Sequence, residues 1–247
     1  MRVSAAAKRL SQVCFKDNKT VAPRAEDGAK AMHYIIKLFG LMSEGLKYTA
    51  GLFVITIVLS MPLGLLMTFL RNSRFAPLRW VMSGYVWLMR GSPLLLQLYF
   101  FYYGLASIPF VKSFLTLDRF PAACIAFVLN YAAYFCEIFR GGLLAVDKGQ
   151  HEAAKVLGFN KWQTLTKIVL PQMIRVTLPS VSNECITLVK DTALITAIGV
   201  TEILYFAKTS VNRDVNATAY LVAAIFYLLM NLVLTRLFSR LEKKYAF

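Results

Sequence analysis

Charged side chains inside otherwise apolar stretches are the residues of this sequence best placed to do chemistry. Glu184 lies within the largely apolar segment from Pro171 to Val189, and no charged residue occurs within five positions of it. A carboxylate in such surroundings is costly, so it usually faces a cavity or a specific partner. Glu184 could therefore bind a cationic group such as an ammonium, or it could bond a neighbouring helix. The sequence leaves both interpretations open.

Other ionisable residues border the apolar stretches. Glu137 and Arg140 are three residues apart, the spacing at which side chains on a helix can pair, so a structural ion pair is favoured over contact with a substrate. Arg90 is interpreted as the boundary of an apolar segment, and Lys190 and Asp191 are expected to pair or to cap a helix. Together with Glu184, these residues are the candidates for a substrate pathway: Glu184, Glu137, Arg90, Lys190 and Asp191.

Motifs for bond-making chemistry are missing. No GxxxxGK[ST] phosphate loop occurs, so any ATP that drives this protein, with its Mg²⁺, must bind to another chain. The four cysteines form no CxxC pair and no metal-ligand spacing, and we interpret them as small apolar fillers. We therefore expect no catalytic residue, no metal site and no cofactor on this chain.

Long uncharged runs predict that the protein lies in a membrane. Of the 247 residues, 57% are hydrophobic and only 17% are charged, whereas a soluble domain is about a quarter charged. Four runs are uncharged: Tyr48–Leu70, Gly91–Val111, Phe120–Cys136 and Val215–Thr235. Crossing the hydrocarbon layer takes about 20 apolar residues. The alternative, a soluble protein with buried core helices, is disfavoured because such helices are seldom uncharged for more than about 14 residues.

The fold predicted from these runs is an all-α polytopic membrane protein with about five transmembrane helices. Trp80–Met89 is expected to be an interfacial helix, and Thr192–Ala207, interrupted by Glu202, a re-entrant or scaffold segment. The segment 175–207 could also be divided differently. The expected crossings are Tyr48–Leu70, a helix starting near Pro93, Phe120–Phe139, Pro171–Val189 and Val215–Thr235.

The first 31 residues differ from the rest of the chain. They are polar, contain seven Lys or Arg residues and carry no apolar segment of a signal peptide. We expect residues 1–31 to form a disordered basic tail and residues 32–247 to form the transmembrane domain. From Met32 an amphipathic pattern predicts an interfacial helix that leads into the first crossing.

The distribution of positive charge predicts the orientation. The formal net charge is +15, and in a membrane protein Lys and Arg collect on the cytoplasmic side, so no nucleic-acid partner is inferred. Segments 71–79, 140–175 and 236–247 hold three, six and four basic residues, whereas the opposite loops hold only Lys112, Arg119, Lys208 and Arg213. This pattern predicts an outside N-terminus and a cytoplasmic C-terminus. The basic tail opposes that orientation.

The polar insertion from Gly149 to Pro171 predicts two short helices. Gly149 is expected to break the chain before the first, and Gly158 can adopt the positive φ that closes a helix. Asn160 can cap the second helix, with Gln163 placed as in a capping box. Ala153 and Ala154 offer a surface that a partner can approach closely. Pro171 is expected to end the second helix and to start the next crossing.

This insertion resembles the EAA loop of ABC importer permeases. The motif reads Glu-Ala-Ala, three residues, Gly, nine residues, then Ile-x-Leu-Pro. The resemblance implies a coupling helix that docks in a groove of a cytoplasmic ATPase. The alternative is an ordinary helix-turn-helix loop, which the full spacing between two membrane segments disfavours. All fixed positions are present: Glu152, Ala153, Ala154, Gly158, Ile168, Leu170 and Pro171.

Four further segments are similar to permeases for polar amino acids, a family that includes importers of histidine, arginine, glutamine, glutamate and cystine. The likeness extends from about Leu46 to Lys208, and Ala193 departs from the serine that usually follows Asp-Thr. The segments are Arg90–Gln97, Ala133–Gly142, Pro171-Gln172 and Lys190–Leu194.

The resemblance implies a transport subunit, not an enzyme, in a bacterial cytoplasmic (inner) membrane. It would work as a homodimer or as a heterodimer with a related permease, together with two ABC ATPase subunits and an extracytoplasmic solute-binding protein. The substrate would be a polar amino acid. The alternatives are a secondary transporter or channel that acts without an ATPase, or a membrane scaffold. Secondary transporters usually show internal repeats, and we find none here.

Overall fold

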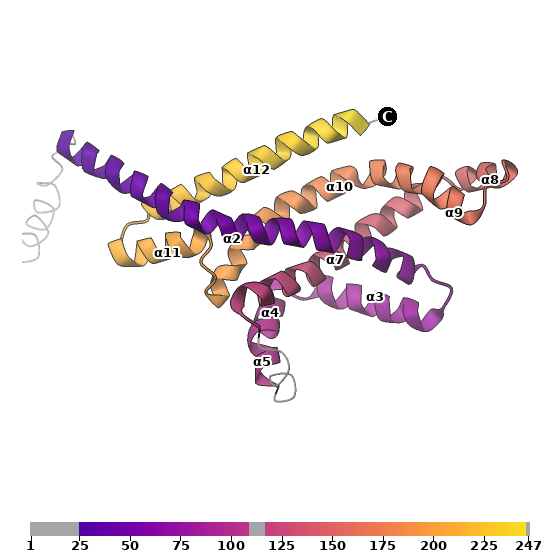
Figure 1. The fold of residues 1–247 in the computed structure, drawn as a ribbon, viewed down its shortest axis with the longest axis horizontal. Helices are drawn as coiled ribbons and strands as arrows, with labels where there is room; N and C mark the ends of the chain where they lie inside the picture. The colour runs from indigo at the N-terminus through magenta and orange to yellow at the C-terminus, as the bar shows by residue number, and fades with distance from the viewer. Residues whose placement is uncertain (1–24, 109–116, 246–247) are drawn as a thin grey trace, which may run out of the picture.

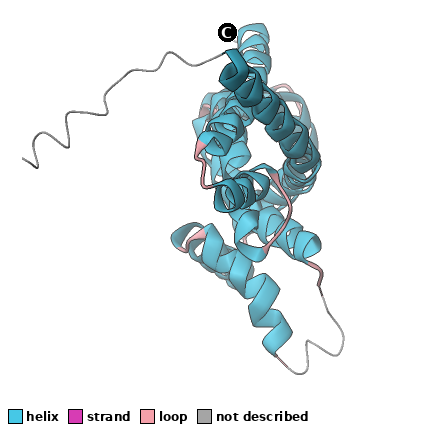
Figure 2. Ribbon diagram, turned by 90° about the vertical axis from the view of Figure 1, so that its left-hand side faces the viewer, coloured by secondary structure: helices cyan, strands magenta, loops and turns pink. Residues whose placement is uncertain are grey.

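The structure is a computed structural model that describes residues 25–108 and 117–245. All regular elements within these ranges are helices, so the all-α prediction is confirmed (Figures 1 and 2). The elements are α2 (Ala25–Arg71), α3 (Ala76–Gly91), α4 (Leu94–Tyr99), η1 (Phe100–Gly104), α5 (Leu105–Ser107), α7 (Arg119–Ala145), α8 (Lys148–Val156), α9 (Lys161–Thr164), η2 (Leu165–Val169), α10 (Leu170–Asp191), η3 (Thr192–Ile198), α11 (Ile203–Asp214) and α12 (Thr218–Tyr245).

Three described helices, α2, α7 and α12, are long and apolar enough to cross a membrane. The helical run Lys161–Ile198 meets α11 at an angle of 54°, a bent pair that has the length and composition of either a broken fourth crossing or a re-entrant segment. The number of crossings therefore roughly matches the expectation. The predicted second crossing differs: the described part, Leu94–Ser107, is a short apolar helix, and its expected end near Val111 lies outside the described residues.

The first helix corrects the expected division between an interfacial helix and a first crossing. α2 is continuous over 47 residues and includes Pro62 in its interior. At 1.5 Å per residue it is about 70 Å long, more than twice the ~30 Å hydrocarbon layer. Its first half packs against α11 and α12, with Leu38 and Met42 fully buried. The helix begins at Ala25, inside the expected tail, whose residues 1–24 lie outside the described ranges.

Small residues let α2 approach α7 closely. A Cβ atom added to Gly64 would lie 2.7 Å from Cβ of Phe135 and 2.9 Å from the carbonyl oxygen of Ala132. One turn away, the Thr68 hydroxyl is positioned to donate to the carbonyl oxygens of Gly64 (2.8 Å) and Cys136 (3.0 Å). Close contact between small residues is a main source of helix association in lipid. This contact fixes α7 as the centre of the bundle.

Trp80–Met89, expected to be an interfacial helix, forms most of α3, and its depth in the membrane stays a prediction. α3 returns alongside α2 and packs on α7, where Val86 and Met89 are buried (Figure 1). The apolar run was expected to stop at the interface because Arg90 ends it. In the structure Glu137 of α7 lies 3.5 Å from Arg90 and offsets its charge, so α3 can pack within the bundle.

Buried amides stabilise the bend between α3 and α4. Pro93 has no N–H and keeps Ser92 extended, with ψ of 146°, so the helix must break there. The Gln97 side-chain amide donates to the carbonyl oxygen of Met89 at 2.8 Å. The Asn130 amide donates to the same oxygen at 3.1 Å and to Gln97 Oε1 at 3.0 Å. The carbonyl left free by the bend is thereby satisfied.

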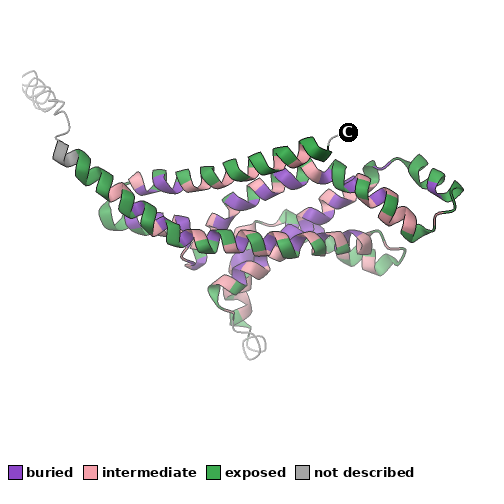
Figure 3. Ribbon diagram, turned by 45° about the horizontal axis from the view of Figure 1, so that its top comes forward, coloured by how far each residue is buried: buried purple, intermediate pink, exposed green. Residues whose placement is uncertain are grey.

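The three basic segments gather at one end of the molecule. The turn after α2, the α8–α9 region and the C-terminal end of α12 all lie toward the right in Figure 1, whereas α11 and the start of α2 lie at the opposite end. Figure 3 shows that the right-hand end is largely exposed and that the buried residues concentrate in the middle. The helices therefore bring together the segments that the charge pattern assigns to one side. Which side faces the cytoplasm stays a prediction.

Two glycines of α2 provide a test of the α2–α7 contact. We expect Gly64→Ala to destabilise the protein by about 1–3 kcal/mol, because the added methyl group overlaps α7. Gly40→Ala is the matched control: no atom lies within 4 Å of its added Cβ, so a stabilisation of about 0.5–1 kcal/mol is expected from helix propensity. Thermal unfolding in detergent measures both. Equal shifts of the two midpoints would contradict the close contact.

Candidate functional site

The polar insertion folds into two short helices, as predicted. The beginning of the first differs from the expectation for Gly149. The helix α8 starts at Lys148, and the Asp147 carboxylate caps it by accepting a hydrogen bond from the backbone N–H of Gly149 at 2.7 Å. Gly149 thus lies within the first turn. Its missing side chain leaves room for the cap, because a Cβ there would lie 2.7 Å from Asp147 Oδ1.

The turn between the two helices follows the prediction. Gly158 has a φ of +79°, a conformation that residues with a Cβ rarely adopt. Asn160 and Gln163 form the expected capping box, in which each side chain accepts from the other's backbone N–H at 2.9 Å. The turn is consequently rigid, since glycine geometry and reciprocal capping both define it.

Pro171 does not end the second helix. The chain continues as one helical run from α9 through the π-helical turn η2 into α10, and Pro171 occupies the first turn of α10. A proline inside a helix lacks an N–H and clashes with the carbonyl four residues earlier, here Lys167. The π-turn directly before it, which contains Ile168, widens the backbone at that carbonyl. The loop and the following crossing are therefore one continuous element.

The loop exposes apolar side chains on an otherwise polar surface. Val156, Leu157 and Trp162 are 87%, 71% and 71% exposed. Glu152 and Ala153 are exposed as well, whereas Ala154 is fully buried, so only one of the two alanines offers the surface that was expected. Apolar side chains gathered on a polar surface are typical of a protein-binding site.

Glu137 is the centre of an ion-pair cluster. Its carboxylate accepts a hydrogen bond from Arg140 Nε at 2.8 Å, which confirms the predicted pair. It also binds Arg71, and Arg90 Nη1 lies 3.5 Å away. No sequence pattern pointed to Arg71, because it is 66 residues from Glu137. A carboxylate held by three guanidinium groups has little capacity left for a ligand, so the structural role is favoured.

Glu184 lies half-buried on α10 and forms no hydrogen bond or ion pair with any residue in the described ranges. It interacts electrostatically with Asp191 and Arg90. The guanidinium of Arg90 lies 5.4 Å from the centre of the Tyr134 ring, within the range of a cation–π contact. Charges of both signs therefore face one region between α3, α7 and α10.

Asp191 has a partner that was not predicted. Its Oδ2 accepts a hydrogen bond from the hydroxyl of the buried Tyr131 at 2.7 Å. The adjacent Lys190 is exposed and forms no salt bridge within 4 Å among the described residues, so the expected Lys190–Asp191 pair is absent. Asp191 is instead bonded to Tyr131, while the side chain of Lys190 is exposed.

Glu202 is a buried acid that the sequence identified only as an interruption. Its side chain is inaccessible to solvent and accepts hydrogen bonds from Tyr205 N at 2.8 Å, from the Tyr227 hydroxyl at 2.6 Å and from the Thr196 hydroxyl. It is the N-cap of α11. The preceding 3₁₀ turn and the angle to α11 agree with the broken segment expected at Thr192–Ala207.

Comparison with known proteins identifies a family that this chain matches. Residues 60–247 match the family described as binding-protein-dependent transport system inner membrane component. The chain is 38% identical over 206 residues to the L-cystine transport system permease protein TcyB of Bacillus subtilis (strain 168), covering 83% of this chain and 86% of that protein. It is 35% identical over 202 residues to the arginine transport system permease protein ArtQ of the same organism, covering 81% and 90%.

A third relative is the glutamine transport system permease protein GlnP of Escherichia coli (strain K12), 33% identical over 205 residues with 83% and 92% coverage. Among solved structures, one described as an amino acid ABC transporter with histidines matches with a TM-score of 0.78 and 30% identity, covering 85% of this chain and 97% of that one. The MetNI methionine ABC transporter matches with a TM-score of 0.69 but 19% identity, which supports the fold alone. These matches include the loop and the charged cluster.

The ion-pair cluster yields a prediction about stability. We expect Glu137→Gln to lower the free energy of unfolding by about 1–3 kcal/mol, because it leaves partly buried arginines without their counter-charge. The double variant Arg71→Gln with Glu137→Gln should recover part of the loss. Thermal unfolding of the two single variants and the double variant gives the coupling energy. Additive effects would show that the pair does not stabilise the bundle.

Proposed function

The chain belongs to the family of binding-protein-dependent transport system inner membrane components as an amino acid ABC transporter permease, and from this premise we propose that it imports a polar amino acid and couples to a separate ATPase through residues 149–171. Permeases of this family are transport components, not enzymes. The observation that carries the coupling proposal is the unbroken helical run from the loop into α10.

The coupling role follows from the shape and connection of the loop. The exposed side chains of Val156, Leu157 and Trp162 offer an apolar surface for a groove on the ATPase. Gln172 on α10 donates to Gln150 on α8 at 3.2 Å, which joins the two helices. A displacement of the docked loop would pass along α10 to Glu184 and Asp191. ATP-driven closure of two ATPase subunits would thereby change access to the pathway.

The proposed residues for coupling divide into two groups. Glu152 and Ala153 are exposed and would contact the ATPase, whereas Ala154, Gly158 and the segment from Ile168 to Pro171 would maintain the conformation of the loop. This division rests on burial and on the positive φ of Gly158. ATP and Mg²⁺ would bind to the partner ATPase, because this sequence has no phosphate loop.

The substrate proposal rests on the mixed charges between α3, α7 and α10. The names of the relatives refer to cystine, arginine and glutamine, all zwitterions. Glu184 and Asp191 could accept an ammonium group, and Arg90 and Lys190 could bind a carboxylate. Glu137 would act indirectly by positioning Arg90. Which polar amino acid is bound is left to transport assays.

The proposed assembly contains two permease subunits, alike or related, two ABC ATPases and an extracytoplasmic binding protein. The site of action would be the bacterial cytoplasmic membrane, with the N-terminus outside and the C-terminus inside, because the basic segments share one end of the molecule. The alternative is a secondary transporter or channel without an ATPase. Co-purification with an ATPase and ATP-dependent uptake in proteoliposomes separate the two, since an autonomous transporter needs neither.

The turn at Gly158 tests the coupling proposal. A β-branched residue at a φ of +79° is strained by about 1–2 kcal/mol, so Gly158→Val should lower uptake roughly 5–30-fold while ATP hydrolysis by the complex continues. Gly141→Val is the control, because its Cβ position is also open but its backbone is helical. Uptake and hydrolysis are measured in the same proteoliposomes. Normal coupled uptake by Gly158→Val would remove the docking role.

Glu184 tests the substrate proposal. Glu184→Gln keeps the shape and removes the charge, so uptake of a cationic amino acid should fall roughly 10–100-fold with near-normal expression. Glu44→Gln is the control, since it makes the same chemical change in an exposed pair with Lys47. Radiolabelled uptake of arginine, glutamine and cystine is compared for both variants. If Glu184→Gln transports all three like the parent, the carboxylate lies outside the pathway; a lower unfolding temperature with unchanged selectivity would make it structural.

A further inference from the structure

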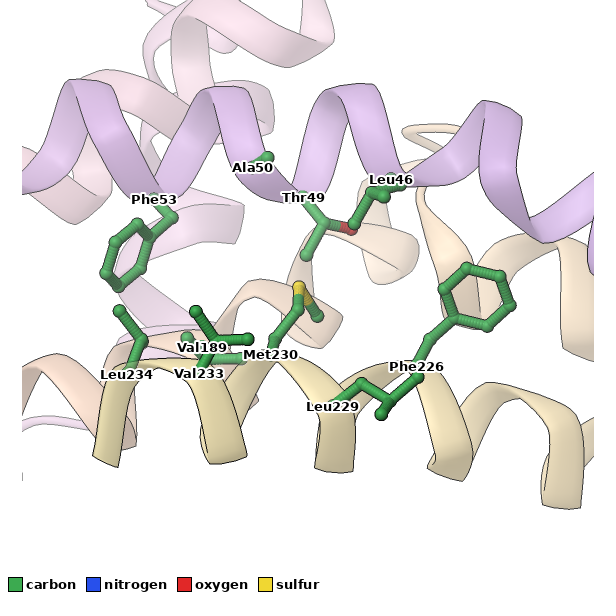
Figure 4. Close-up of a pocket in the computed structure, with 10 residues that line it drawn as sticks. All are labelled: Leu46, Thr49, Ala50, Phe53, Val189, Phe226, Leu229, Met230, Val233 and Leu234. Carbon is green, nitrogen blue, oxygen red and sulfur yellow. The ribbon is translucent and has the colours of Figure 1, made fainter. Parts of the chain in front are cut away.

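An apolar groove runs between α2 and α12 at the middle of both helices. Figure 4 shows side chains from the two helices facing one another. The hollow between them has a volume of about 440 Å³, and Val189 of α10 also lines it. Thr49 is the one lining residue with a polar side chain, and its hydroxyl is already bonded to the carbonyl oxygen of Gly45 at 3.3 Å. The groove therefore offers an occupant no unpaired polar group from these side chains.

The groove opens sideways from the bundle. Ala50, Leu229 and Val233 line it and are exposed, and the membrane-spanning part of α12 is mostly exposed. Near one end the helices touch through the rings of Phe39 and Phe226, whose centres are 5.4 Å apart. An occupant can therefore enter from the side, in the plane of the membrane.

A basic stripe continues the groove along α12. Val233, Leu237, Arg240 and Lys244 follow at intervals of four, three and four residues, which places them on one face of the helix. Arg240 lies about 10 Å beyond Val233 along the axis. Arg240 and Lys244 are exposed and form no ion pair within the described ranges. The nearby Glu242 is turned away, because it accepts a hydrogen bond from Ser182 of α10 at 2.6 Å.

We propose that this groove and stripe bind an anionic phospholipid. One acyl chain fills the groove, and the phosphate lies at Arg240 and Lys244. The apolar groove comes first along α12 and the two basic residues follow it. The acyl chain and the headgroup of one lipid have the same order. Basic clusters beside transmembrane helices attract anionic headgroups.

A second copy of the chain is a poorer occupant. Membrane subunits pair about a two-fold axis along the membrane normal, so equivalent residues lie at the same depth. Two such grooves facing each other would place Arg240 and Lys244 of one copy close to the same residues of the other. Like charges in contact disfavour that arrangement, whereas a phosphate neutralises them.

Quenching by brominated lipid tests the proposal on the full-length chain. Trp80, Trp87 and Trp162 are replaced by Phe, and Phe53→Trp places a single indole in the groove. The protein is reconstituted in phosphatidylcholine vesicles with increasing amounts of phosphatidylglycerol that carries dibrominated acyl chains. We expect quenching to reach its maximum at a low mole fraction of phosphatidylglycerol. This corresponds to at least a tenfold preference of the groove for phosphatidylglycerol over phosphatidylcholine. Quenching in proportion to the bulk mole fraction would overturn the proposal.

Two pairs of variants locate the headgroup and the chain. Arg240→Gln with Lys244→Gln should reduce the preference about fivefold for each charge removed, whereas Arg74→Gln with Arg79→Gln, which removes two exposed charges from the turn after α2 and from α3, should leave it unchanged. Ala50→Phe should fill the groove and abolish saturable quenching, and Val58→Phe, exposed but outside the groove, should not. Equal effects of both charge pairs overturn the headgroup site. Dimers of the same variants are also measured by chemical cross-linking. If Ala50→Phe loses the cross-linked dimer but keeps saturable quenching, the groove binds a second copy of the chain.

Discussion

The hydrocarbon layer provides no water, so polar groups placed within it are stabilised by partners in the chain, and much of the bundle is organised around such partners. Glu137 is paired with arginines, Gln97 and Asn130 satisfy the carbonyl of Met89 at a helix break, and Glu202 is bonded by three donors. These interactions come from helices that are distant in sequence. The polar residues thus help to determine which helices are neighbours, together with the close small-residue contact between α2 and α7 at Gly64.

The same constraint explains how the loop is joined to the pathway. In a regular helix Pro171 would clash with the carbonyl four residues earlier, but the π-turn η2 accommodates it and the helix continues. The loop that is proposed to bind an ATPase and the helix that carries Glu184 are consequently one element. A transporter needs such an element, because energy supplied at one surface must change access at a distance.

Much of the fold could be predicted from the sequence, because uncharged length and local capping are local properties. The long helices, the positive φ of Gly158, the Asn160–Gln163 capping box and the Glu137–Arg140 pair all depend on residues close in the chain. The packing of α3 could not be predicted, since it depends on a charge partner of Arg90 on another helix. Tyr131 gave no sign that it binds Asp191, because 60 residues separate them.

Assembly order adds one consequence of the Glu137 cluster. Arg71 and Arg90 are synthesised before Glu137, so α2 and α3 are complete before their shared counter-ion exists. Until then each arginine must extend its long side chain toward the headgroups to remain hydrated. The arrival of α7 supplies the carboxylate and the small-residue surface together, and both earlier helices can then settle against it. α7, although it is translated after α2 and α3, therefore determines how those two helices pack.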